Sequence, residues 1–321
     1  MKNKIIIGII FILFLVNTGF TKTTKSYSDI IAGIPATPFA AALAGAHTAF
    51  ANDINSLYLN PSAIAGIEHS GIIFANSKLY EGIYLNYFGF VYNKIKILNE
   101  NISIGLDFTL LNTDEIERTY IINNNGLANP AAGGYYKNTD KMLGLYYAGI
   151  IENFKFGLGV KYLNSKLADK TADAVRGVVA LQKSFLDEKL WWGVVVKNFG
   201  GKLTYVSKAE EASTRFISGF GYKHNFKISE LKIEVDAEYI KSDKINYYGS
   251  IDFMPLPVFN LRVGYDSKND ANKNNFNLGC GINFLSNKNK ILVFDYAFIP
   301  NSDLGNSHRF ALTFNWGYKK E

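Results

Sequence analysis

The most regular feature of the chain is a two-residue alternation of apolar and polar positions, which begins near residue 70 and continues to the C-terminus. In the clearest run, every second residue from Leu231 to Tyr239 is apolar, and the intervening residues are Lys232, Glu234, Asp236 and Glu238. Successive side chains of a β-strand point to opposite faces. Each run therefore predicts a strand with one apolar and one polar face.

The alternation predicts about fourteen strands, several of them longer than ten residues. Strands of soluble proteins are usually about five or six residues long, so the length favours a transmembrane barrel over a soluble β-sandwich. The predicted strands cover residues 71–78, 81–92, 100–112, 141–151, 153–165, 173–186, 189–199, 213–224, 229–241, 244–254, 257–267, 274–286, 289–299 and 307–317.

The predicted connections give a second indication of a barrel. Long connections, such as the loop predicted at 113–140, fall mainly on one rim, and tight turns such as Asp187–Glu188 fall mainly on the other. Outer-membrane barrels have long external loops and short periplasmic turns. The expected fold is an all-β transmembrane antiparallel barrel of about fourteen strands, located in the outer membrane, with its apolar face against membrane lipid.

The polar face of each strand should then line an enclosed lumen. We expect Arg309 to pair with Asp295 across the last hairpin, and Trp191, Trp192, Tyr296 and Trp316 to form girdles at the membrane interfaces. The candidate lumen residues are Asp107, Glu234, Asp236, Glu238, Arg262, Asp295 and Arg309.

The first residues resemble a secretory signal. Lys2 and Lys4 precede an apolar run from Ile5 to Val16, which is too short for a membrane-spanning helix of about 20 residues. We therefore expect a signal peptide over residues 1–21, a periplasmic or plug segment over 22–69 and the barrel over 70–321.

Residues 34–68 lack the two-residue alternation. A run of mostly small residues after Pro38 predicts a short helix that ends near Asn52 and Asp53. A brief turn should follow and end at Asn60 and Pro61, because proline disfavours helical geometry in the residue before it. Fourteen strands enclose a lumen wider than their own side chains fill. This segment is therefore the expected plug, with Asp53 and Asn60 holding its backbone through side-chain hydrogen bonds.

The composition limits the chemistry that the chain can support. Its single cysteine, Cys280, excludes an intramolecular disulfide, and its four histidines (His47, His69, His224 and His308) have no metal-ligand spacing. A net charge of +6 without a dense basic cluster argues against nucleic-acid binding. No Walker loop, Rossmann fingerprint or nucleophile elbow is present, so we expect neither an enzyme nor a cofactor.

Two stretches resemble a known family. The segment from Leu43 through Gly45, Asp53 and Asn60-Pro61 to Ala65 is similar to the N-terminal signature of PorV/PorQ-type outer-membrane proteins, which are distant relatives of the FadL long-chain fatty-acid transporters. Asp295–Arg309 resembles their penultimate hairpin. The chain departs from the signature at Ala44, at Asn52 and at Ser62-Ala63-Ile64. The resemblance implies a fourteen-stranded barrel with an N-terminal plug.

Three functions remain open at this point. The leading hypothesis is passive transport of small hydrophobic compounds, as the FadL-like resemblance implies. The alternatives are docking of secreted proteins for a type IX secretion system, as the PorV resemblance implies, and a purely structural barrel. The expected partners are outer-membrane lipid and either hydrophobic small molecules or a secreted protein.

Overall fold

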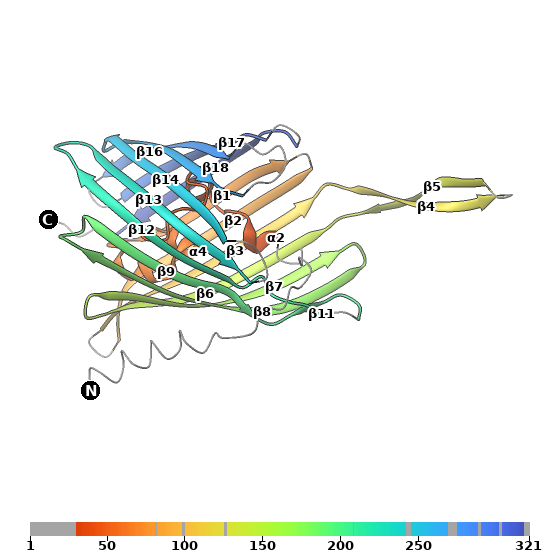
Figure 1. Cartoon of the computed structure of the whole chain (residues 1–321), viewed down its shortest axis with the longest axis horizontal. Helices are drawn as coiled ribbons and strands as arrows, with labels where there is room; N and C mark the ends of the chain where they lie inside the picture. Colours follow the sequence, from red (N-terminus) through yellow and green to blue (C-terminus); the bar gives the residue numbers. More distant parts are fainter. Residues whose placement is uncertain are drawn as a thin grey trace.

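The two-residue alternation folds into strands that close on themselves (Figure 1). The computed structural model describes residues 30–80, 82–97, 100–124, 127–207, 209–241, 245–268, 275–287, 290–301 and 304–317. Fourteen antiparallel strands form one closed barrel in the order β1-β18-β17-β16-β15-β14-β13-β12-β9-β8-β7-β6-β3-β2. They are β1 (Ser70–Tyr80), β2 (Ile83–Ile97), β3 (Glu100–Thr113), β6 (Thr139–Ile151), β7 (Phe154–Leu167), β8 (Lys170–Phe185), β9 (Leu190–Gly200), β12 (Arg215–Asn225), β13 (Glu230–Ile240), β14 (Ile245–Leu256), β15 (Phe259–Asp266), β16 (Phe276–Asn287), β17 (Lys290–Ile299) and β18 (Ser307–Trp316).

The predicted fold class and strand number are confirmed, and most strand ends differ from the prediction by a few residues. The largest difference is in β2, which was expected to end near residue 92 but continues to Ile97. A register shift between Tyr92 and Ile95 interrupts the two-residue period there, because a β-bulge inserts an unpaired residue. This irregularity concealed the end of the strand.

Two predicted loops contain strands of their own. Residues 113–140 hold a hairpin of β4 (Ile116–Asn124) and β5 (Leu127–Tyr136), and residues 200–212 hold the short strands β10 (Leu203–Thr204) and β11 (Ala209–Glu210). The β4–β5 hairpin protrudes far beyond the barrel rim (Figure 1). It leaves from the rim opposite the start of β1 and the end of β18, which pair at Ser70 and Trp316.

The two faces of the wall differ as the alternation predicts. On β13, Val235 is 58% exposed while Glu234 beside it is 1% exposed. Apolar side chains cover the outside of the barrel, which is the surface that a transmembrane barrel presents to lipid. No helix among the described residues is long and apolar enough to cross a membrane.

The segment before β1 lies inside the barrel (Figure 1). It contains α2 (Ile30–Gly33), α3 (Pro38–Ala42), α4 (Ser56–Leu59) and the 3-10 helix η1 (Pro61–Gly66). We call the described residues 30–69 the plug. The predicted helix reaching Asn52 is wrong, because α3 ends at Ala42 and the chain turns through Ala44 and Gly45 at positive φ. The Gly45 N–H bonds to the Ala40 carbonyl at 2.8 Å and closes the end of this helix.

Candidate functional site

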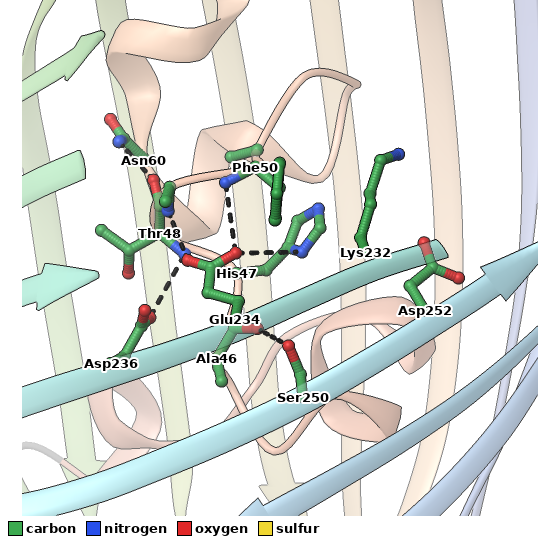
Figure 2. A network of polar contacts seen from close by, with 12 residues as sticks. Ala46, His47, Thr48, Phe50, Asn60, Lys232, Glu234, Asp236, Ser250 and Asp252 are labelled. Carbon is green, nitrogen blue, oxygen red and sulfur yellow. Dashed lines mark hydrogen bonds and ion pairs between the residues drawn. The ribbon is translucent and has the colours of Figure 1, made fainter. Parts of the chain in front are cut away.

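The polar side chains of the barrel wall meet the plug in a buried network (Figure 2). The plug loop 46–51 presents consecutive backbone N–H groups to β13. Glu234 accepts from the N–H of Ala49 at 2.5 Å and from that of Phe50 at 3.2 Å, and Asp236 accepts from Thr48 at 3.2 Å. Backbone N–H groups buried without a partner are costly, so the two carboxylates fix this loop against the wall.

The carbonyl groups of the same loop are bound from other directions. Gln182 on β8 donates to the carbonyls of Ala49 and Ala51 at 2.7 and 2.8 Å. Ser250 on β14 donates to Ala46 at 2.6 Å. The loop is therefore held by the neighbouring strands β13 and β14 and by β8 farther along the wall.

Asn60 links the loop to the second half of the plug. Its Nδ2 donates to the Thr48 carbonyl at 2.7 Å, and its Oδ1 accepts from the Ser62 N–H at 3.1 Å. The second bond caps η1, which begins at Pro61. Asp53 accepts from the N–H and the side chain of Asn55 at 2.9 and 3.0 Å, and so shapes the turn before α4.

A second buried cluster surrounds Arg262 on β15. Its guanidinium lies 2.6 Å from Asp295 on β17 and 3.4 Å from Asp252 on β14, and its Cζ is 4.4 Å from the centre of the Phe39 ring on α3. The predicted pairing of Arg309 with Asp295 is therefore wrong. The strand register places Arg309 opposite Ala297, and its Nη1 donates to the plug carbonyl of Pro35 at 2.8 Å.

Glu238 is the centre of a third cluster, nearer to the rim that carries the hairpin. It lies 2.9 Å from Arg215 on β12 and 3.5 Å from Lys268, and it accepts a hydrogen bond from Tyr248 at 2.5 Å. Its negative charge is thus compensated within the wall.

Two buried lysines differ from these clusters because neither forms an ion pair with a described carboxylate. Lys161 on β7 and Lys197 on β9, which we call the lysine pair, are 3% and 6% exposed. Their ammonium groups lie 6.0 and 4.7 Å from the centre of the Tyr58 ring on α4. Nearby, Asp107 accepts a hydrogen bond from Tyr146 at 2.8 Å. The lysine pair therefore places two basic side chains against the Tyr58 ring of the plug.

Directly on the hairpin side of the lysine pair, the lumen wall becomes apolar. Leu163 follows Lys161 by two residues on the same face of β7. The plug residue Ile31 of α2 is 1% exposed and packs in this region. We call the region that Ile31 fills the apolar chamber, and the apolar residues packed with Ile31 there are Leu79, Leu85, Leu111, Met142, Leu163, Ala172, Ala174 and Leu203.

Glycines on the inner face let the plug backbone touch the wall. A Cβ at Gly157 on β7 would lie 2.6 Å from the carbonyl carbon of Pro61, and a Cβ at Gly264 on β15 would overlap Leu43 and Ala44. Any other residue at these positions would push against plug backbone. The fit between plug and wall is therefore steric as well as polar.

Three titratable plug residues have altered pKa values, and burial raises the pKa of Asp53. Burial lowers the pKa of His47 well below its usual range, and the positive charges of Lys232 and Arg262 lower it further. His47 packs edge-on against Phe39 with ring centres 4.9 Å apart. Burial raises the pKa of Tyr58 to about 12, so this residue is a neutral phenol beside the lysine pair.

The structure places all the candidate lumen residues on the inner face of the wall. Five of them belong to the three clusters above, Asp107 lies with Tyr146, and Arg309 binds the plug carbonyl of Pro35. Gly45, Asp53, Asn60 and Pro61 lie in the plug, each at a turn or a helix boundary. The sequence interpretation missed Gln182 and the lysine pair, although all three occupy inner positions of predicted strands. It also placed Trp191 in an interfacial girdle, whereas Trp191 is 8% exposed and its ring centre lies 6.0 Å from that of Phe50 in the plug.

Comparison with known proteins identifies the fold. No protein-family profile and no curated protein sequence matches this chain. Among solved structures, it resembles the Pseudomonas putida toluene transporter TodX (TM-score 0.60, 9% identity, covering 86% of this chain and 96% of that one). It also resembles the Ralstonia pickettii toluene transporter TbuX (0.56, 10%, 88% and 98%) and a Pseudomonas aeruginosa FadL homologue (0.50, 12%, 88% and 98%). The chain therefore has a FadL-like barrel fold.

Proposed function

We propose that this chain is an outer-membrane barrel that passes hydrophobic compounds passively through its lumen. The observation that carries the proposal is the apolar chamber, a cluster of apolar wall side chains that packs around Ile31 of the plug near the hairpin-bearing mouth of the lumen. Binding sites for small apolar molecules are concave and mostly apolar, with a few placed polar groups. TodX and TbuX, which share the fold, are toluene transporters, and this agrees with such a cargo.

The proposal includes the domain organisation predicted from sequence. Residues 1–21 would be removed as a signal peptide, residues 22–69 would form the plug and residues 70–321 the barrel. The plug would then control passage, because Ile31 occupies the chamber and loop 46–51 closes the lumen behind it. Cargo would enter the chamber by displacing Ile31 and would leave when the plug moves. The chain carries no nucleotide-binding motif, so the concentration gradient would drive passage.

The lysine pair favours cargo with an acidic group. A compound whose apolar part fills the chamber would place an anionic end next to Lys161 and Lys197. The two ammonium groups could then form ion pairs with this buried negative charge. A neutral hydrocarbon would use the chamber alone. We therefore propose apolar compounds as the general cargo and amphipathic acids as the preferred ones.

Uptake into proteoliposomes tests this function. We would compare dodecanoate, its methyl ester and toluene in the wild type and in Lys161→Met/Lys197→Met, with Lys155→Met as the control. Lys155 is a wall lysine near the opposite rim, 4.9 Å from the Trp191 ring. We expect the double variant to lose about tenfold in dodecanoate uptake and to keep toluene uptake. Equal rates for protein-free and protein-containing vesicles with every compound would exclude transport.

The β4–β5 hairpin favours a second function, the docking of an exported protein in the manner of PorV. Its two strands form a separate sheet, so each has an edge that no other described strand covers. A two-stranded hairpin alone is marginally stable in water, and open edges can accept a further strand. Replacing residues 116–136 by a short glycine linker should abolish capture of a purified cargo domain while dodecanoate uptake persists. If only uptake changes, docking is excluded.

A further inference from the structure

The outer surface of the barrel has a groove that is separate from the lumen and from the plug. It has a volume of about 530 Å³ and crosses β17, β18, β1, β2 and β3. In the register, Phe74 lies opposite Phe88 on one side and Leu312 on the other, and the Phe74 and Phe88 ring centres are 5.0 Å apart. The groove is lined on its outer side by Phe74, Phe88, Phe108, Phe294, Phe310 and Leu312. Because this surface belongs to the apolar belt, it faces membrane lipid.

Two amides interrupt this apolar surface. Asn76 on β1 and Asn86 on β2 lie opposite each other, and Asn76 Nδ2 donates to Asn86 Oδ1 at 2.8 Å. Both line the groove. This bond leaves the carbonyl oxygen of Asn76 and the amide hydrogens of Asn86 without a partner among the described residues. Amide groups that face hydrocarbon need a hydrogen-bonding partner, because no water is present there.

A basic residue, Lys78, lies on the same outer face of β1, closer to the rim at which this strand ends. Lys78 on β1 lies opposite His308 on β18 and Tyr84 on β2, and its side chain is exposed. With a rise of about 3.4 Å per residue, it lies roughly 7 Å farther along the strand towards the rim than Asn76. Since β1 ends at Tyr80 and β2 begins at Ile83, the wall ends just beyond Lys78. Lysine and tyrosine at this depth are typical of the headgroup region.

We propose that this face is a specific site for one phosphate-bearing lipid with carbonyl-linked acyl chains. The chemistry along β1 follows the order of such a lipid: an aromatic groove for an acyl chain, the Asn76–Asn86 amide pair for the carbonyl, and Lys78 for the phosphate. At each level of the membrane, the polarity of the protein side chains matches that of the lipid group expected at the same depth. The site depends only on the transmembrane position of the barrel and not on the transport of any cargo.

Native mass spectrometry of the full-length barrel in detergent micelles tests the proposal. The probes are phosphatidylglycerol with ester-linked chains, its ether-linked analogue, and diacylglycerol with the same ester-linked chains. The variants are Lys78→Ala, Asn76→Leu/Asn86→Leu, and the control Lys183→Ala. Lys183 is a wall lysine near the opposite rim, 4.1 Å from the centre of the Phe154 ring.

We expect the wild type and Lys183→Ala to retain one molecule of ester-linked phosphatidylglycerol, about tenfold more than of diacylglycerol. Lys78→Ala should lose this preference for phosphate. The asparagine double variant should bind the ester and ether lipids equally, whereas the wild type should favour the ester. Equal retention of all three probes by the wild type would overturn the proposal, as would equal losses in Lys78→Ala and Lys183→Ala. Because Lys78 is exposed at the strand end, its variant keeps the test valid even if the double variant does not fold.

Discussion

The carboxylate of Glu234 lies 2.5 Å from the backbone nitrogen of Ala49, although the two residues are 185 positions apart in the chain. The same carboxylate accepts from Phe50 and lies 3.6 Å from His47 Nδ1. One wall side chain therefore contacts three residues of the plug loop, His47, Ala49 and Phe50 (Figure 2).

Replacing Glu234 with leucine should loosen this loop without opening the barrel. Two buried N–H groups would lose their acceptor, at a cost of roughly 3 kcal/mol in total. We expect the amides of residues 48–50 to exchange hydrogen about a hundredfold faster. The matched control is Glu230→Leu, because Glu230 lies on the same strand but contacts Lys223 and Lys232 instead of the plug. Unchanged exchange in Glu234→Leu would show that the wall does not hold the loop.

Asp295→Asn should destabilise the wall beneath α3. The Arg262 guanidinium would stay buried with only Asp252, 3.4 Å away, as a counter-charge. Removing one partner of a buried pair costs about 3–5 kcal/mol, and the remaining carboxylate favours the lower end of that range. Arg262→Met/Asp295→Asn should recover most of the loss, because it removes both charges. Urea unfolding in lipid vesicles measures the free energy of unfolding of the two single variants and of the double variant. If the loss in the double variant equalled the sum of the losses in the two single variants, the prediction would be contradicted.

The alternation of polar and apolar residues was enough to predict the closed barrel and the inward direction of Glu234, Arg262 and Arg309. It was not enough to predict partners. Whether Arg309 meets Asp295 depends on the register between β17 and β18, and on the plug carbonyl of Pro35 that binds its guanidinium. Neither is encoded in a local pattern.

Other features were missed although a local signal existed. Lys161 lies at an inner position of a predicted strand, but its role depends on Lys197, a neighbour two strands away in the wall. The sequence Asn125-Gly126 is a strong hairpin signal, and the surrounding β-branched and aromatic residues favour strands, yet residues 113–140 were interpreted as a loop. The end of α3 was misplaced because alanines continue past it, while the turn at Ala44 and Gly45 is set by contact with the wall at Gly264.

Gly157→Ala should displace the plug while the barrel stays closed. The added methyl group would meet the backbone of Pro61 and Ser62, which cannot rotate away as a side chain can. Overpacking of this kind costs about 1–3 kcal/mol, and we expect a higher ion conductance in planar bilayers. The control is Gly249→Ala, where nothing lies within 4 Å of the added Cβ. Equal conductance in both variants would mean that the plug tolerates the contact.

Acidification should loosen the plug through His47. Its pKa is lowered in the folded state, so the unfolded or released segment binds the proton more readily. The stability that neutral His47 provides is complete above its unfolded pKa of about 6.5, and it is lost as the pH falls from there towards the folded pKa. At pH 5.5, one pH unit below the unfolded pKa, plug opening should become more favourable by up to about tenfold. Hydrogen exchange of residues 46–51 between pH 7.5 and 5.5, corrected for intrinsic rates, should therefore show faster opening in the wild type and no change in His47→Leu. If the 3.6 Å contact with Glu234 instead kept His47 charged, the wild type would become more protected on acidification, and the sign of the effect distinguishes the two states.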